Sequence, residues 1–138
     1  MIGIGSVAWA PAAMASGSVE DQVVALVNKA RADAGCSAVK VDSRLTKAAA
    51  GHSADMAKRN YFDHTTPDGV TFDQRIKKAG NPSPGAENIA QGYRTANEVM
   101  DGWLKSEGHK ANIVNCSLKT IGVAVSDTGD YWTQDFGR

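Results

Sequence analysis

The sequence carries no excess of charge of either sign. Its 138 residues include 15 Lys and Arg and 15 Asp and Glu, which gives a formal net charge of +0. The basic residues are scattered, and no basic run is longer than Lys77-Lys78. Proteins that bind nucleic acid or an anionic membrane surface rely on a basic excess or a basic cluster. We therefore expect neither partner.

Several motifs of well-known enzyme classes are also absent. The chain has no Gly-x-Ser-x-Gly elbow, no His-Glu-x-x-His helix, no Walker loop and no dinucleotide fingerprint. With two cysteines in all, it has neither a Cys-x-x-Cys redox motif nor a four-cysteine zinc pattern. A nucleophilic Ser–His–Asp enzyme therefore has no support in the sequence.

The length and composition suit one globular domain. A chain of this length can bury roughly two-thirds of its unfolded surface, and 42% apolar with 22% charged residues is an ordinary balance. Residues 1–15 carry no charge, are too short to span a bilayer, and end in the small-x-small pattern Ala13-Met14-Ala15. We interpret them as the remnant of a signal peptide that lacks its basic start, with a disordered tail as the alternative. The domain then covers residues 18–138.

The two cysteines, Cys36 and Cys116, are expected to form a disulfide if the protein is exported. Because their separation is 80 residues, the bond would restrict the unfolded chain strongly. The chain-entropy model gives about 4.5 kcal/mol, less any strain in the bond. The alternative is a pair of buried, unpaired thiols.

Apolar periodicity and turn signals predict helices in the first part of the chain and a hairpin at its end. Capping residues at Ser18, Thr71 and Thr95 mark three helix starts. The expected helices cover residues 18–34, 43–60, 71–80, 95–104 and a short turn at 109–114, and the expected extended segments cover 39–41, 87–91, 120–126 and 130–136. This order predicts an α+β fold in which helices cover a small, mainly antiparallel sheet in a three-layer arrangement.

Two histidines and one glutamate are candidate site residues. His64 follows Tyr61-Phe62 and precedes a turn, which places it near the surface where a helix ends. Glu87 lies in an otherwise small and apolar strand, where a buried carboxylate requires a partner. His109 follows Gly108 near the start of a helical turn. Two imidazoles and a carboxylate from three separate segments are what a metal site or an acid–base site requires.

Each candidate also has an ordinary structural explanation. His64 and His109 can be polar loop histidines, and Glu87 can face solvent, because the alternation around it leaves no clean apolar face. His52, which shares a helix face with apolar residues, is better explained as a structural histidine. Glu107 lies close to His109 in sequence and can contribute a second carboxylate. The residues alone leave these alternatives open.

Six short motifs occur in order along nearly the whole chain, from about Val19 to Phe136. They are His52-Ser53-x-x-Met56, Tyr61-Phe62-x-His64-Thr65, Gly85-x-Glu87-Asn88-Ile89-Ala90, Trp103-x-x-Ser106-x-Gly108-His109-x-x-Asn112-Ile113, Ile121-Gly122-Val123 and Tyr131-Trp132-Thr133-Gln134-x-Phe136. In this order they resemble the CAP superfamily, also called the SCP domain. That family includes cysteine-rich secretory proteins, antigen 5 and plant pathogenesis-related class 1 proteins, and the likeness is greatest to its compact bacterial branch.

The resemblance implies an α-β-α sandwich and a cleft with two histidines and two glutamates, which in some members binds zinc or another divalent metal. His64 matches the first histidine, His109 the second histidine, and Glu87 the first glutamate. The second glutamate has no clean match, because Ser106 stands at its position and Glu107 comes one residue late. The resemblance therefore implies that His64 and His109 bind the metal. The residues that surround them in the cleft are Glu87, Glu107, Ser106 and Asn88.

The favoured function is a secreted, non-enzymatic binding module. Its cleft is expected to hold a divalent cation such as zinc and a small-molecule, lipid or peptide ligand, with cell wall or a host protein as further partners. We expect a monomer without a membrane span. The alternative is a metal-assisted hydrolase that acts on peptides or cell-wall material, with Glu87 as the general base. A third possibility is an inactive cleft and a protein partner that binds the outer surface.

Overall fold

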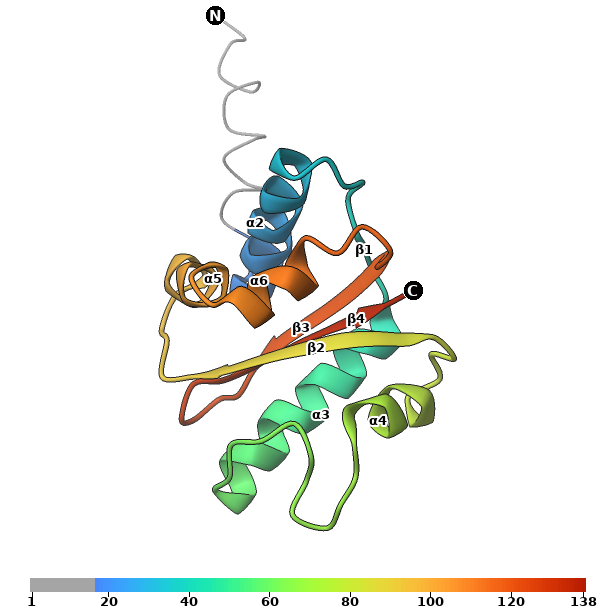
Figure 1. Ribbon diagram of the computed structural model, residues 1–138. Helices are drawn as coiled ribbons and strands as arrows, with labels where there is room; N and C mark the ends of the chain where they lie inside the picture. Colours follow the sequence, from blue (N-terminus) through green and yellow to red (C-terminus); the bar gives the residue numbers. More distant parts are fainter. Residues whose placement is uncertain (1–16) are drawn as a thin grey trace, which may run out of the picture.

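A four-stranded mixed sheet forms the middle layer of the computed structural model, which describes residues 17–138 (Figure 1). The strands lie in the order β1-β3-β4-β2. β3 pairs antiparallel with β4, β4 pairs antiparallel with β2, and the short β1 pairs parallel with β3. Their bounds are Lys40–Val41 for β1, Pro84–Gln91 for β2, Thr120–Val125 for β3 and Tyr131–Gly137 for β4. The prediction of a small, mainly antiparallel sheet is confirmed.

Helices cover both faces of this sheet (Figure 1). α2, α5 and α6 lie on one face, and α3 and α4 lie on the other. Their bounds are Val19–Asp33 for α2, Ser43–Arg59 for α3, Phe72–Lys78 for α4, Ala96–Leu104 for α5 and Glu107–Ile113 for α6. The predicted three-layer α-β-α sandwich is therefore confirmed. The interpretation of residues 1–15 as a signal-peptide remnant lies outside the described residues.

Predicted capping residues begin three of the helices, with Ser18 at the start of α2, Thr71 at the start of α4 and Thr95 at the start of α5. Ser18 Oγ accepts a hydrogen bond from Asp21 N at 3.0 Å at the start of α2. Thr95 Oγ1 accepts one from Glu98 N at 3.1 Å at the start of α5. Each bond satisfies a backbone N–H that has no partner inside the helix. None of the helices among residues 17–138 is both long and apolar enough to cross a bilayer.

Two elements begin earlier than the sequence pattern predicted. β2 begins at Pro84 rather than Glu87, with a register irregularity between Pro84 and Ala86. Proline lacks an N–H but is tolerated at the first residue of a strand, so its presence did not exclude this start. α6 begins at Glu107 rather than His109, because Ser106 takes the N-cap position.

The larger core lies between the sheet and the layer formed by α2, α5 and α6. It contains apolar side chains from the sheet and from all three of these helices, and its largest members are Trp103 and Trp132. On the opposite face, a smaller cluster of Leu45, Ala48 and Ile76 joins α3 to α4. Trp103 and Trp132 are therefore core residues, each 1% exposed.

A buried arginine and the predicted disulfide fasten the end of α2 to the segment after α6. Cys36 is bonded to Cys116, which confirms the predicted pair. Arg31 is 0% exposed, and its guanidinium donates to four backbone carbonyl groups at 2.9 to 3.0 Å. The acceptors belong to Ser37, Ile113, Asn115 and Leu118. Because a buried charge without partners is costly, these carbonyl groups must keep their positions.

Helix α3 packs very closely on β3 at Gly122. A Cβ atom added at Gly122 would overlap the backbone of Leu45 and Thr46 in α3. Only a residue without a side chain allows the helix backbone to approach the strand this closely. Gly122 therefore fixes the depth at which α3 lies on the sheet.

Substitution of Gly122 by alanine tests this close approach. We expect Gly122→Ala to lower the free energy of unfolding by about 1–3 kcal/mol, because the added methyl group forces the helix and strand apart. The measurement is urea-induced unfolding followed by circular dichroism. The matched control is Gly51→Ala in α3, whose new Cβ would meet nothing within 4 Å. That change should stabilise the protein by up to about 1 kcal/mol, since alanine favours the helix. Equal midpoints for wild type and Gly122→Ala would contradict the packing argument.

Candidate functional site

Glu87 lies in the middle of β2 and is buried, with both carboxylate oxygens engaged. Its Oε2 accepts a bond from Arg75 Nη1 at 2.9 Å, and its Oε1 accepts one from Arg75 Nη2 at 3.0 Å. His64 Nδ1 lies 2.9 Å from the same Oε1. Only 1% of the Glu87 side chain is exposed. The sequence left open whether Glu87 faces solvent or is buried with a partner. In the structure it is buried and has partners.

Arg75 holds three parts of the site together. It comes from α4, and besides its two bonds to Glu87 it donates from Nη2 to His64 O at 2.6 Å. Its side chain is 12% exposed, so the ion pair is shielded from water. Two parallel N–H···O bonds to one carboxylate are among the strongest side-chain contacts in proteins. Arg75 therefore positions both Glu87 and the segment that carries His64.

These contacts determine the charge of Glu87. Burial by itself raises the pKa of this carboxyl group, but the hydrogen bonds with His64 and Arg75 and the neighbouring acid Asp135 outweigh burial and lower the pKa to about 2. The positive charge of Arg75 acts in the same direction as those hydrogen bonds. Glu87 is consequently a carboxylate throughout the physiological pH range.

A second carboxyl group, Asp135, lies opposite Glu87 on the neighbouring strand. The two residues are register partners in the β2–β4 pair. Asp135 is 0% exposed, and neither of its oxygens has a hydrogen-bond partner of normal geometry among residues 17–138. Burial raises the pKa of Asp135 well above its usual range, and the negative charge of Glu87 raises it further. Both effects favour the protonated, neutral form of Asp135 beside the ionised Glu87.

On the other face of β2, a chain of amide side chains positions α6. Asn88 Nδ2 donates to His109 O at 3.1 Å and to Gln134 Oε1 at 2.9 Å. Asn112 Nδ2 donates to Asn88 Oδ1 at 2.9 Å. Asn88 is 0% exposed, so its bonds are fully shielded from water. The backbone of α6 at His109 is thereby tied to the strand that carries Glu87.

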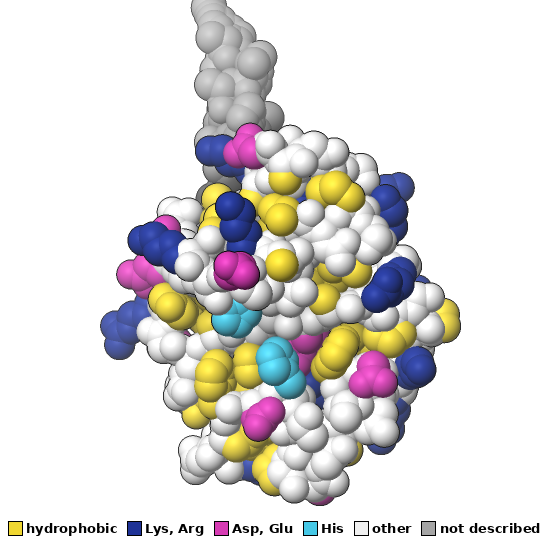
Figure 2. Space-filling view, in the orientation of Figure 1, with side chains coloured by type: hydrophobic (Ala, Val, Ile, Leu, Met, Phe, Trp, Pro, Cys, Tyr) yellow, Lys and Arg dark blue, Asp and Glu magenta, His cyan; other side chains and the backbone are white. Residues whose placement is uncertain are grey.

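The imidazole of His109 is partly buried and is in a neutral state at pH 7. Burial lowers the pKa of His109, and the nearby His64 lowers it further. The Nδ1 atom of His109 is buried and has no hydrogen-bond partner among residues 17–138. Figure 2 shows two histidine side chains near the middle of the face that is turned to the viewer. The third histidine, His52, is 1% exposed and its Nε2 lies 2.8 Å from Asp63 O, which fits the structural role expected of it.

A shallow pocket of about 390 Å³ opens beside these groups. It is lined by polar groups of the site and by small or apolar residues: His64, Glu87 and Asn112, with Phe72, Gly85 and Ala86. The pocket lies between the end of α6 and the start of α4, above the edge strand β2. Its lining offers a ligand an imidazole, an amide and an aromatic ring.

Two of the residues that the sequence placed around the site make no hydrogen bond to it. Ser106 is the N-cap residue of α6, and Glu107 is an exposed residue in the first turn of that helix. Among residues 17–138, neither side chain is hydrogen-bonded to His64 or Glu87. A carboxylate in the first turn stabilises a helix by itself, so Glu107 has a simple structural role. That Glu107 takes the place of the family's second glutamate stays a prediction.

The part of the chain that the structure describes holds no group of three or more His, Cys, Asp or Glu side chains arranged around a common metal position. A closed structural zinc site, which needs four protein ligands, is thus absent there. Of the two predicted metal ligands, His64 lines the pocket, and His109 lies near enough for His64 to lower its pKa; their role as ligands stays a prediction. Glu87 is not free to join them, because Arg75 occupies both of its oxygens.

Arg75 and Asp135 are the site residues that sequence reasoning missed. The requirement that a buried Glu87 needs a cation pointed to some basic residue, but 15 Lys and Arg were available. Arg75 is twelve residues from Glu87 and Asp135 is 48 residues away, and only the α4 position and the β2–β4 register bring them together. An acid inside the expected strand 130–136 was the available signal for Asp135.

Known proteins with similar sequences and structures fall into one group. A family model described as the cysteine-rich secretory protein family matches residues 24–136. The chain is 40% identical over 118 residues to the uncharacterized protein YkwD of Bacillus subtilis (strain 168), which covers 85% of this chain and 46% of that protein. The chain thus spans less than half the length of that relative.

Solved structures give the same result. An extracellular protein containing a SCP domain from Bacillus anthracis str. Ames is similar with a TM-score of 0.80 and 34% identity, over 87% of this chain and 40% of that chain. An outer surface protein from Borrelia burgdorferi is similar with a TM-score of 0.76 and 26% identity, over 84% of this chain and 89% of that chain.

The pH dependence of stability tests the neutral state of Asp135. Folding raises the pKa of Asp135, so the protein takes up a proton on folding once the pH exceeds the unfolded value of about 3.9. Its stability must therefore fall as the pH rises toward the folded pKa. Asparagine takes up no proton. We expect Asp135→Asn to gain stability over wild type by up to about 1.4 kcal/mol per pH unit above pH 4.

The measurement is the urea midpoint of wild type and Asp135→Asn between about pH 5 and pH 8. Glu87 works in the opposite sense, because its lowered pKa adds stability that is lost as the pH falls below about 4.5 toward 2. That contribution changes only below about pH 4.5, so the comparison of the two proteins is made above about pH 5, where Glu87 is ionised in both. Asp33→Asn, a change at an exposed aspartate, is the control. A stability difference that does not vary with pH would contradict a protonated Asp135.

Proposed function

The chain belongs to the cysteine-rich secretory protein (CAP) family, and on that premise we propose that it is a secreted binding module. Its cleft between His64 and His109 holds a divalent metal ion and a small or extended ligand. The single observation that carries this proposal is the bond between His64 Nδ1 and Glu87 Oε1 at 2.9 Å. It leaves the other ring nitrogen, Nε2, as the one that is available to a metal.

Secretion is supported by two independent features. Cys36 and Cys116 form a disulfide, and disulfides persist in oxidising compartments outside the cytosol. The similar proteins from Bacillus anthracis and Borrelia burgdorferi are described as extracellular and as an outer surface protein. Both features are expected of a protein that functions outside the cell.

The groups around His64 suit a metal ligand. Histidines that bind metals usually donate their second ring N–H to a carboxylate, which fixes the ring and raises its basicity. Glu87 is an ionised acceptor in the right place, and Arg75 holds it still. His109 is kept neutral by burial, and the neutral imidazole is the form that binds a metal. A bound divalent ion supplies a Lewis acid for a carbonyl, carboxylate or phosphate oxygen of a ligand.

The pocket lining indicates the size and chemistry of the ligand. Phe72 and Ala86 offer apolar contact, and Asn112 offers an amide close to His64. A volume of about 390 Å³ suits a small molecule or one part of an extended chain. A lipid, a peptide and a cell-wall fragment all combine an apolar or sugar-like part with an oxygen-rich group.

A metal-assisted hydrolase is the less favoured alternative. A general base works best when its pKa lies near the operating pH, whereas the pKa of Glu87 is lowered to about 2. Both of its oxygens are also committed to Arg75 and His64. Glu107 is exposed and, within residues 17–138, has no bond to this cluster. For these reasons the site is better suited to bind than to abstract a proton.

Calorimetric titration with zinc near pH 7 tests the binding proposal. The wild-type protein, stripped of metal, should bind one zinc ion, and both His64→Ala and His109→Ala should abolish the heat. Glu87→Gln should weaken binding about 10–100-fold, as changes to the partner of a metal-bound histidine do. The matched control is Glu107→Gln, which removes an exposed carboxylate that, within residues 17–138, has no hydrogen bond to the site, and it should leave the affinity unchanged.

Absence of zinc heat in the wild-type protein would remove the metal from the proposal. The hydrolase alternative has its own test, in which wild type and Glu87→Gln are incubated with a peptide library and with peptidoglycan. We expect no turnover by either protein. Cleavage by wild type that disappears in Glu87→Gln would favour the hydrolase over the binding module.

A further inference from the structure

The two edges of the sheet differ in how far their outward backbone groups are hydrogen-bonded. At the β2 edge, side chains already occupy the outward carbonyl groups. Trp103 Nε1 donates to Ile89 O at 3.0 Å, and Asn112 Nδ2 donates to Glu87 O at 3.4 Å. An unpaired strand edge is a template for another strand, and these donors cover it. The β2 edge is therefore closed to an additional strand.

The other edge is covered for only part of its length. β1 pairs with β3 at two register positions, Lys40 with Thr120 and Val41 with Ile121, and the chain then turns into α3. β3 continues to Val125. Among residues 17–138, no other strand pairs with β3 on this side.

The backbone polar groups of the uncovered part point outward. Ile121 O accepts a bond from Asp42 N at 3.0 Å on the β1 side, whereas Ser126 N donates to Tyr131 O at 2.9 Å on the β4 side. In an antiparallel pair the bonding direction alternates along the strand. Odd-numbered residues of β3 thus direct N–H and C=O away from β4. The next two such residues, Val123 and Val125, face the open side.

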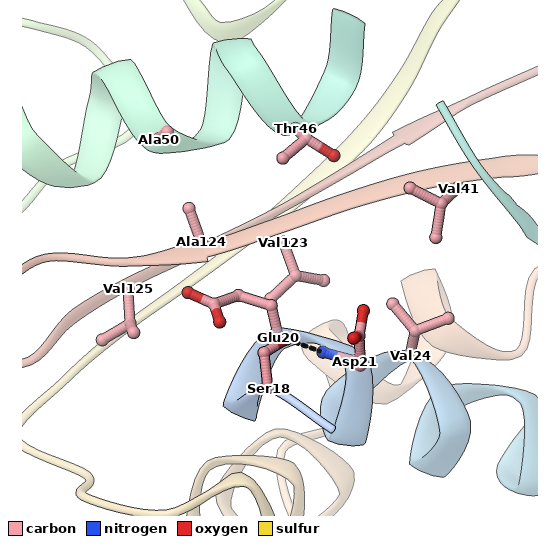
Figure 3. Close-up of a pocket in the computed structure, with 10 residues that line it drawn as sticks. All are labelled: Ser18, Glu20, Asp21, Val24, Val41, Thr46, Ala50, Val123, Ala124 and Val125. Atoms are coloured by element: carbon pink, nitrogen blue, oxygen red, sulfur yellow. Dashed lines mark hydrogen bonds between the residues drawn. The ribbon is translucent and has the colours of Figure 1, made fainter. Parts of the chain in front are cut away.

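A groove of about 390 Å³ runs along this open edge (Figure 3). β3 forms its floor, the start of α2 forms one wall, and α3 forms the opposite wall with Thr46 and Ala50. Val123 is only 3% exposed, so the strand edge lies at the bottom of the groove rather than on a flat surface. An occupant must therefore reach the strand edge between the two helices.

We propose that this groove binds an extended peptide segment of a partner protein, which pairs with Val123 and Val125 as an added strand. Addition of a strand to an open sheet edge is a common form of peptide recognition, in which backbone bonds give affinity and side-chain pockets give specificity. The floor supplies the backbone donors and acceptors, and the walls supply the pockets. This site lies at the opposite edge from the His64 cleft and does not depend on the metal proposal.

The lining determines which side chains the peptide carries. Val24 and Val41 present apolar surface beside the strand edge. The charged lining residues are Glu20 and Asp21, both acidic, and the described part of the chain places no lysine or arginine in the lining. The peptide therefore combines apolar residues that face the valines with lysine or arginine that pairs with the two carboxylates.

Two other occupants fit the groove less well. A second copy of this chain would bring a sheet edge that is likewise recessed between α2 and α3 rather than an extended segment that projects. Residues 1–16 precede α2 in the sequence, but they contain no lysine or arginine to complement Glu20 and Asp21. A basic, extended segment from another protein meets both the shape and the charge.

The test uses the full 138-residue chain and a blocked peptide, in which alternating valine and threonine lie between two terminal lysines. Binding is followed by two-dimensional ¹H–¹⁵N NMR. We expect the amide signals of Val123 and Val125 to shift on titration. A peptide with glutamate in place of both lysines should bind at least tenfold more weakly, and so should a peptide N-methylated at alternate amides.

Ala50→Arg provides the decisive variant, because Ala50 is exposed on α3 and the arginine side chain would fill the groove. It should weaken binding at least tenfold. The matched control is Gly51→Arg, the adjacent position on α3, which lines a different pocket with His52 and Lys47 and should leave binding unchanged. Equal binding by wild type and Ala50→Arg, or equal binding of the N-methylated peptide, would overturn the proposal.

The remaining outcomes also decide between occupants. Peptide binding that appears only after residues 1–16 are removed would assign the groove to the chain's own leading segment and overturn the proposal. Shifts of Val123 and Val125 that depend on protein concentration without peptide would assign it to a second copy, with the same consequence. No shift of these two amides at saturating peptide would exclude strand addition at this edge.

Discussion

Glu87 places a full negative charge inside the protein, where water cannot solvate it, and the groups that balance this charge must keep fixed positions. Arg75 balances it with two bonds at 2.9 and 3.0 Å, and His64 adds a third contact at 2.9 Å. Arg75 belongs to α4, and His64 belongs to the segment between α3 and α4. The apolar contact between these helices is small, with Leu45, Ala48 and Ile76 at its centre. The ion pair therefore ties α4 and the segment that carries His64 directly to β2.

The same charge explains why Asp135 is neutral. Arg75 contributes one positive charge to the cluster, and Glu87 already uses it. A second carboxylate on the adjacent strand would be buried without a counter-ion, which costs more than keeping the proton. The cluster of Arg75, Glu87 and protonated Asp135 is thus neutral as a whole. A protein can keep two carboxyl groups side by side in its interior only with such a division of roles.

The sequence predicted the secondary structure and the disulfide better than it predicted the contacts within the site. Local signals were sufficient for helix starts, because Ser18 and Thr95 bond to backbone groups three residues away. The disulfide followed from the cysteine count together with expected export, and the cleft residues His64, Glu87 and His109 followed from the order of motifs. The partners of Glu87 did not follow. Arg75 reaches it through the placement of α4, and Asp135 through a strand register that joins residues 48 positions apart. Such contacts depend on tertiary structure and leave no periodic pattern in the sequence.

The bonds that close one edge of the sheet also build the cleft. Asn112 and Trp103 come from α6 and α5, and by donating to β2 carbonyl groups they hold these helices over the strand that carries Glu87. Asn88 fixes the backbone of His109 from the same strand. The bonds that protect the β2 edge from other strands are therefore the same bonds that hold α5 and α6 over the cleft. Within residues 17–138, β3 has no equivalent donors beyond Ile121, since the chain leaves the sheet for α3 after two paired residues. An edge that is recessed between two helices is protected from whole sheets by its shape, and this shape still admits a single extended chain.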